Sequence, residues 1–144
     1  MQIDGSCHCG AITFRAEADA DTAGGCHCPD CQKLAGSAFR SVVSVAEKNF
    51  ELLSGAPKIC VKTADSGNRR VQAFCENCGL AVYAPSTGEV DRTFGLRLGT
   101  VTRRDRFVAR HQYWARSVLH WLPRLNEIEK VGGNTRPQRG QAHG

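Results

Sequence analysis

Seven of the eight cysteines in this 144-residue chain lie in three closely spaced clusters. The clusters are Cys7 with Cys9, then Cys26 with Cys28 and Cys31, then Cys75 with Cys78, while Cys60 stands apart. In a chain that lacks a secretory signal, such clusters indicate metal ligands or catalytic thiols rather than a disulfide framework. Clusters this far apart in sequence can share a metal only if the intervening chain folds back on itself.

Composition is that of an ordinary soluble globular protein, with 41% apolar and 23% charged residues. We expect one domain over residues 1–131 and a disordered basic tail over residues 132–144, which are rich in Gly, Asn, Arg, Pro, Gln and His. No apolar run approaches the roughly 18 residues that span a bilayer. The first five residues, Met-Gln-Ile-Asp-Gly, have neither a basic region nor an apolar core. We therefore predict a cytoplasmic protein with no membrane partner.

The formal net charge of +5 is weak support for a nucleic-acid partner. Metal binding requires deprotonated thiols, so seven thiolates and two zinc ions would lower this charge to about +2. The late arginines also lack the interleaved aromatic residues of single-strand binders. We expect small-molecule partners and no nucleic acid, and the sequence carries no indication of the oligomeric state.

Alternating apolar residues predict a mainly β fold with little helix, built of short strands at hairpin spacing. The predicted strands cover residues 11–16, 37–45, 58–63, 69–74, 80–83, 94–100 and 108–114. Residues 19–25 are predicted as a loop, 46–50 as a loop or helical turn, 64–68 as a hairpin turn, and 32–35 and 117–121 as helical turns. We expect Cys60 to be a buried strand residue, and Trp114 and Trp121 to be core aromatics.

The number of clustered thiols points to two unequal zinc sites, because zinc takes four tetrahedral ligands. A Cys-x₂-Cys turn followed by Gly79 brings two sulfurs together, and the shorter turn ending at Gly10 does the same. Two such pairs make one closed structural site. Three thiols then remain, which leaves the open position typical of catalytic zinc. Spacing alone does not determine the pairing. We favour Cys7, Cys9, Cys75 and Cys78 as the structural zinc ligands, and Cys26, Cys28 and Cys31 as the open, catalytic zinc site.

Other arrangements fit the same residues. Both sites could be structural, with Cys60 or a histidine completing the second. His8 and His27 lie between ligand cysteines, so we expect their side chains to point away from the metal. A protein with purely structural zinc would be a binding module without catalysis. A thiol- or metal-handling protein would instead form disulfides within the triple cluster when zinc leaves.

The clusters and their surroundings resemble the glutathione-dependent formaldehyde-activating enzyme family. The resemblance covers about residues 1–125 and is carried by Gly5-Ser6-Cys7-His8-Cys9-Gly10-Ala11-Ile12, Cys26-His27-Cys28-Pro29-Asp30-Cys31-Gln32-Lys33, Gly36-Ser37-Ala38-Phe39 and Phe74-Cys75-Glu76-Asn77-Cys78-Gly79, with weaker matches at residues 96–100 and 111–114. It implies a β-tent fold, in which several small antiparallel sheets surround a four-cysteine zinc site.

The same resemblance implies an activity and its cofactors. The family joins formaldehyde to glutathione as S-hydroxymethylglutathione, formally a carbon–sulfur lyase reaction in reverse. It implies two zinc ions per chain, of which the second need not be fully occupied, and glutathione as co-substrate. Three residues that closely follow the triple cluster, Lys33, Ser37 and Arg40, are candidates to hold a substrate carboxylate.

Overall fold

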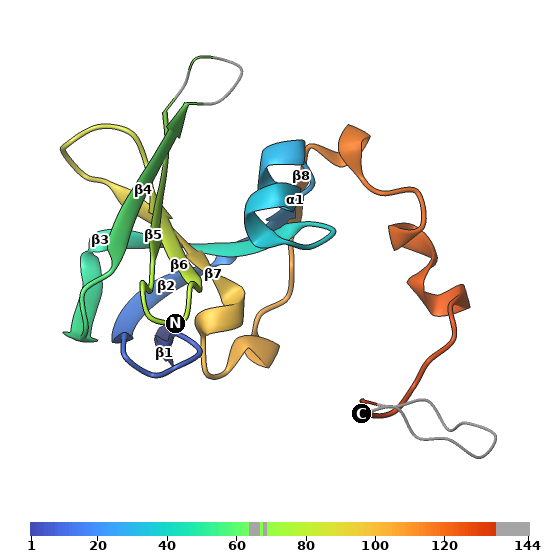
Figure 1. Ribbon diagram of the computed structural model, residues 1–144, viewed down its shortest axis with the longest axis horizontal. Helices are drawn as coiled ribbons and strands as arrows, with labels where there is room; N and C mark the ends of the chain where they lie inside the picture. Colours follow the sequence, from blue (N-terminus) through green and yellow to red (C-terminus); the bar gives the residue numbers. More distant parts are fainter. Residues whose placement is uncertain (64–66, 68, 135–144) are drawn as a thin grey trace.

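Eight strands form one hydrogen-bonded sheet in the part of the chain that the computed structural model describes, residues 1–63, 67 and 69–134 (Figure 1). The strands are β1 (Gln2–Ser6), β2 (Thr13–Cys26), β3 (Arg40–Ser54), β4 (Lys58–Thr63), β5 (Arg69–Phe74), β6 (Ala81–Pro85), β7 (Thr93–Arg97) and β8 (His111–Tyr113). Their order is β1-β2-β3-β7-β6-β5-β4, and every neighbouring pair on this path is antiparallel. Strand β8 lies off the path and pairs with β2 in parallel.

Helix is confined to short segments within these residues. They are α1 (Pro29–Ala35) and the 3₁₀ helices η1 (Leu98–Thr100), η2 (Arg104–Arg106), η3 (Ala115–Ser117) and η4 (Leu122–Glu127). The prediction of a mainly β fold with little helix is confirmed. None of the helices in the described residues is long and apolar enough to cross a membrane.

The sheet curls into a half-barrel because its two longest strands bend. The pairing of β2 with β3 shifts register three times, and the two larger shifts lie between Ala16 and Ala18 and between Asp19 and Gly24. Such bulges bend a strand and increase its twist. The strands of the expected small sheets are consequently joined edge to edge along one path.

The core packs against one face of the sheet. Burial alternates along β2, where Phe14 is fully buried while Arg15 and Glu17 are exposed. This is the period-2 pattern of a sheet with one dry face. Phe14 stacks on Phe50, with ring centroids 5.3 Å apart. The hydrophobic cluster also includes Cys7 and Cys75, which places two of the clustered thiols in the core.

Two predicted irregular segments are strands. Residues 19–25 belong to β2, and residues 46–50 belong to β3. The glycines at the end of β2 suggested a loop, but they serve close packing. A Cβ on Gly24 would lie 2.5 Å from the carbonyl oxygen of His111, and one on Gly25 would lie 2.8 Å from the Phe39 ring. The predicted turn at residues 64–68 and most of the predicted tail, residues 135–144, fall outside the described residues except for Gly67.

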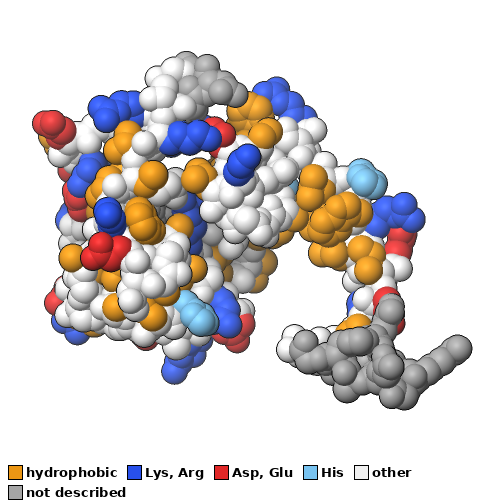
Figure 2. All heavy atoms as spheres, in the orientation of Figure 1, with side chains coloured by type: hydrophobic (Ala, Val, Ile, Leu, Met, Phe, Trp, Pro, Cys, Tyr) orange, Lys and Arg blue, Asp and Glu red, His pale blue; other side chains and the backbone are white. Residues whose placement is uncertain are grey.

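Three expectations about burial and helix are wrong at the edges of the molecule. Cys60 is exposed because β4 is the last strand on the sheet path and all six of its residues are exposed. Trp114 and Trp121 are 48% and 40% exposed, because the chain after β8 extends away from the sheet (Figures 1 and 2). The helical turn expected at residues 117–121 is replaced by η3 and η4 on either side.

Candidate functional site

The first cysteine group is built from two hairpin connections of the same design. In the β1–β2 connection the Cys7 amide donates to the Ile12 carbonyl at 3.0 Å, and in the β5–β6 connection the Cys75 amide donates to the Leu80 carbonyl at 2.9 Å. Each connection contains a glycine with positive φ, as expected for these turns. The hairpins are separated by β3 and β7 in the sheet, so only its curl brings them together.

The four sulfurs of Cys7, Cys9, Cys75 and Cys78 have the spacing that a metal requires. All four lie within 4.8 Å of one another. The Cys7–Cys9 sulfurs are 3.5 Å apart, and the Cys9–Cys75 sulfurs are 3.7 Å apart. A tetrahedral zinc with bonds of 2.3 Å sets its sulfurs ~3.8 Å apart, whereas a disulfide joins them at about 2.05 Å. These residues therefore fit a zinc ion.

Backbone amides favour the thiolate form within this group. The Ile12 amide donates to Cys7 Sγ at 3.3 Å. Hydrogen bonds from the amides of Leu80 and Cys9 lower the pKa of Cys78 to about 6. Amide donors of this kind surround sulfurs that are to be held deprotonated.

The second group, Cys26, Cys28 and Cys31, comes from one short segment. Cys26 ends β2, Cys28 is the N-cap of α1, and Cys31 lies in the first turn of α1. The Cys28 sulfur accepts a hydrogen bond from the Cys31 amide at 3.2 Å, and Pro29 occupies the first helical turn, where it is well tolerated. The three sulfurs also lie within 4.8 Å of one another, so they fit a metal with one position left for another ligand.

Residues 111–117, which we call the C-terminal contact segment, hold this group from one side. The His27 amide donates to the Tyr113 carbonyl at 3.0 Å, and His27 Nε2 lies 2.9 Å from Gln112 Oε1. Gln32 Nε2 donates to the carbonyls of His27 and Ser117, at 2.7 and 3.1 Å. The converging ligand sets in the described residues contain only cysteines, so neither His8 nor His27 joins them.

Arginines surround the triple group. Burial raises the pKa of the Cys31 thiol, as do the neighbouring Cys28 and Cys26 thiols, while the charge of Arg40 opposes this rise. At Cys28 burial is outweighed by hydrogen bonds from Cys31 and Cys26 and by the charge of Arg70, so its pKa is lowered. The site is therefore electropositive around its thiols.

The predicted substrate contacts are only partly brought together. Ser37 and Arg40 line a pocket of about 330 Å³ beside the triple group, but Lys33 is exposed on α1 and does not line it. The pocket also contains Arg97, which sequence reasoning missed. Arg97 reaches the pocket from β7, and no local motif marks it because its position depends on the pairing of β7 with β3.

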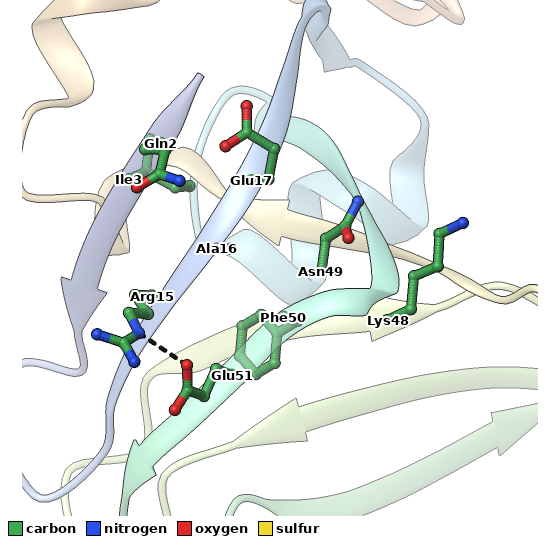
Figure 3. Close-up of a pocket in the computed structure, with 9 residues that line it drawn as sticks. All are labelled: Gln2, Ile3, Arg15, Ala16, Glu17, Lys48, Asn49, Phe50 and Glu51. Carbon is green, nitrogen blue, oxygen red and sulfur yellow. Dashed lines mark hydrogen bonds and ion pairs between the residues drawn. The ribbon is translucent and has the colours of Figure 1, made fainter.

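A separate pocket of about 370 Å³ between β1, β2 and β3 is not a candidate for this chemistry (Figure 3). Figure 3 shows Arg15 and Glu51 pointing toward each other, and they form an ion pair at 2.7 Å. No residue of α1 or of the β5–β6 connection, the segments beside the two cysteine groups, lines this pocket, whereas the pocket of about 330 Å³ contains residues of both.

Known proteins support the fold and the family. A crystal structure of a Rhodobacter sphaeroides protein matches with a TM-score of 0.57 and 17% identity, covering 77% of this chain and 99% of that one, which shows a common fold. The family model for glutathione-dependent formaldehyde-activating enzymes matches residues 2–117, a span that contains both cysteine groups. The chain therefore belongs to the glutathione-dependent formaldehyde-activating enzyme family.

Proposed function

We propose that this protein is a zinc-dependent carbon–sulfur lyase-type enzyme that forms or cleaves the adduct of glutathione, or another thiol, with formaldehyde or a related aldehyde. The observation that carries this proposal is the unequal pair of cysteine groups. One has the four sulfurs of a closed zinc site, and the other has three. A site that lacks one protein ligand is suited to accept a substrate atom.

Each group has its own role in this proposal. Cys7, Cys9, Cys75 and Cys78 hold a structural zinc, and Cys26, Cys28 and Cys31 hold a second, open one. Zinc at the open site would supply Lewis-acid chemistry, either by deprotonating a thiol ligand or by polarising an aldehyde oxygen. The reaction needs no oxidant or reductant: the thiol sulfur bonds to the aldehyde carbon, the carbon–oxygen π bond breaks, and the thiol proton ends on the oxygen.

The surrounding residues position the reactants. Ser37 and Arg40, which line the adjoining pocket, would contact a substrate carboxylate, and Lys33 would contribute only long-range charge from its exposed place on α1. Gln112 holds the His27 ring between the two ligand cysteines. A cytoplasmic location accords with this function, because glutathione and thioredoxin keep thiols reduced there.

Metal stoichiometry tests the proposal. Native mass spectrometry of the wild-type protein should find two zinc ions, and added glutathione should perturb the spectrum of a Co²⁺-substituted triple group alone. The Cys28→Ser variant should retain one zinc and a cooperative unfolding transition, yet lose thiol binding and turnover. The exposed Cys60→Ser variant is the matched control and should behave as wild type. If Cys28→Ser unfolds as completely as Cys75→Ser, the second site is structural and the proposal is wrong.

A further inference from the structure

Two arginines lie on the same face of the sheet as the triple cysteine group. Arg40 is the register partner of Cys26 on β2, and Arg97 is the register partner of Val42 on β3. Side chains directly opposite on paired strands share a face, as do residues two apart on one strand. The sheet therefore presents Cys26, Arg40 and Arg97 to one side.

The Arg97 guanidinium is held by two hydrogen bonds and still has free N–H donors. It is 8% exposed, and its Nη1 donates to the Gly95 carbonyl at 3.1 Å while its Nη2 donates to Gln72 Oε1. A guanidinium carries five N–H donors, so three remain for another partner. Burial, together with the charge of Arg40, lowers the pKa of Arg97 to about 9.

Arg40 is half-buried, and the described residues include no hydrogen-bond or ion-pair partner for its side chain. Its Nε is buried without a hydrogen-bond acceptor. Across the described residues, no carboxylate forms an ion pair with Arg40 or Arg97. Buried charges are normally paired, because removing an unpaired charge from water is costly. Three thiolates with one zinc would carry a net charge of about −1. This offsets only one of the three arginine charges, of Arg40, Arg70 and Arg97, that act on the triple group.

Both arginines line the pocket of about 330 Å³, together with Ser37 and Ser41. Gly79 and Leu80, next to the four-cysteine group, form another part of its wall. The pocket thus lies between the two cysteine groups. Its volume is within the range of roughly 300–1,000 Å³ that holds small ligands.

We propose that this pocket binds a carboxylate of the thiol substrate through Arg40 and Arg97, and that it makes the enzyme selective for anionic over neutral thiols. This inference rests on the proposed function, since it concerns the substrate of the same site. A guanidinium binds a carboxylate through two parallel hydrogen bonds, which gives orientation as well as affinity. The bound carboxylate directs the substrate sulfur toward the triple group.

Two small thiols that differ in the carboxylate measure its contribution to binding. Calorimetry on the zinc-loaded protein compares 3-mercaptopropionate with 2-mercaptoethanol, in which a hydroxyl replaces the carboxylate. Wild type should bind the anionic thiol at least about tenfold more tightly, as expected for hydrogen bonds to a charged group. Arg40→Gln should abolish the preference, and Arg40→Lys should restore part of it. Arg104→Gln, which removes an exposed charge from η2, is the matched control and should keep the full preference. Equal binding of the two thiols by wild type, or a full preference in Arg40→Gln, overturns the proposal.

A third probe distinguishes a failure of this pocket proposal from a failure of the proposed function on which it rests. S-methylglutathione has no free thiol, so its carboxylates can bind the pocket without a sulfur–zinc bond. In one outcome S-methylglutathione binds the wild-type protein, Arg40→Gln weakens this binding at least about tenfold, and neither free thiol perturbs the metal. The pocket proposal is then correct and the proposed function is wrong. If both free thiols perturb the metal equally and S-methylglutathione does not bind, the function stands and the pocket proposal is wrong.

Discussion

The two cysteine groups differ in how far apart in the fold their ligands originate. The four-cysteine group joins two hairpins from distant parts of the sheet, and its Cys7 and Cys75 belong to the hydrophobic core cluster. The triple group comes from six consecutive residues and lies outside that cluster. The first group therefore links distant parts of the fold, whereas the second depends on one local segment. We expect ligand exchange at the second group to leave the fold intact.

The two groups also differ in the polar groups that surround their sulfurs. Backbone amides point toward the sulfurs of the four-cysteine group. Arginine side chains surround the triple group, and their charge acts on Cys28 and Cys31. In the proposed roles, the amide dipoles would stabilise a permanently bound ion, and the free guanidinium donors would bind a substrate that enters and leaves.

The largest expected effect is the loss of the fold when the four-cysteine group is broken. In Cys75→Ser the group loses a sulfur that is 2% exposed. Structural zinc contributes about 10–16 kcal/mol, which rivals the roughly 5–15 kcal/mol of net stability of a domain. We expect no cooperative thermal transition by circular dichroism. Cys60→Ser, at an exposed site, should change the free energy of unfolding by less than about 0.5 kcal/mol. A cooperative transition in Cys75→Ser with both zinc ions retained would remove the distinction between the groups.

Acidification should release zinc in two steps. Metal binding requires deprotonated sulfur, so a lowered pKa means that fewer protons compete with the metal at a given pH. Amide hydrogen bonds lower the pKa of Cys78 to about 6, whereas burial and the neighbouring thiols raise that of Cys75 to about 11. In the triple group the pKa of Cys28 is likewise lowered and that of Cys31 raised, so each group holds thiols of both kinds. The triple group should lose zinc first as the pH falls from neutrality because it supplies only three sulfurs, and the four-cysteine group should follow at lower pH. A chromogenic chelator measures both steps, and the first should be absent in Cys28→Ser. Its persistence in that variant would reverse the assignment.

A smaller effect is expected from loosening the C-terminal contact segment. Gln32→Ala removes two hydrogen bonds, to His27 and Ser117, each worth about 0.5–1.5 kcal/mol. Hydrogen exchange should accelerate in α1 and β8 but not in β3 or β7, because the core is untouched. Gln2→Ala, at an exposed strand position, is the control. Uniform acceleration across the sheet would mean that the triple group is coupled to the core as strongly as the other group.

The smallest effects come from two glycines with positive φ. Gly79 follows the four-cysteine group and Gly36 caps α1, and a Cβ on either would meet no atom within 4 Å. Substitution by alanine therefore carries only the backbone strain, about 1 kcal/mol. Gly79→Ala should lower the midpoint of thermal unfolding by about 4 °C. Gly36→Ala should lower it less, because α1 can loosen without opening the core. Equal shifts would show that α1 unfolds only with the whole domain.

The cysteine groups could be proposed from the sequence because counting clustered thiols and recognising two matching turns need only local patterns, although spacing left the pairing open. In the structure the sulfurs of each proposed set lie within 4.8 Å of one another. The mainly β fold followed from alternation along the chain in the same way.

Features that depend on strand order were not predictable. Arg97 lies by the site only because β7 pairs with β3, a contact that no local pattern encodes. Gly24 and Gly25 indicated a loop because turn-forming and close-packing glycines look alike in a sequence. The exposure of Cys60 likewise depends on the place of β4 at the end of the sheet.

The late position of the C-terminal contact segment has a consequence for biosynthesis. Protein chains fold from the N-terminus as they are made. Every sulfur of the four-cysteine group has been synthesised once residue 78 is added, and β7, which joins the two hairpins in one sheet, is complete at residue 97. This group can therefore assemble before the rest of the chain is made. The triple group is translated much earlier, yet Gln112, Tyr113 and Ser117, which steady it, are among the last contacts to appear. The group whose ligands are complete first is therefore the last to gain its supporting contacts, and chains that stall before residue 111 would lack the hydrogen bonds that hold it.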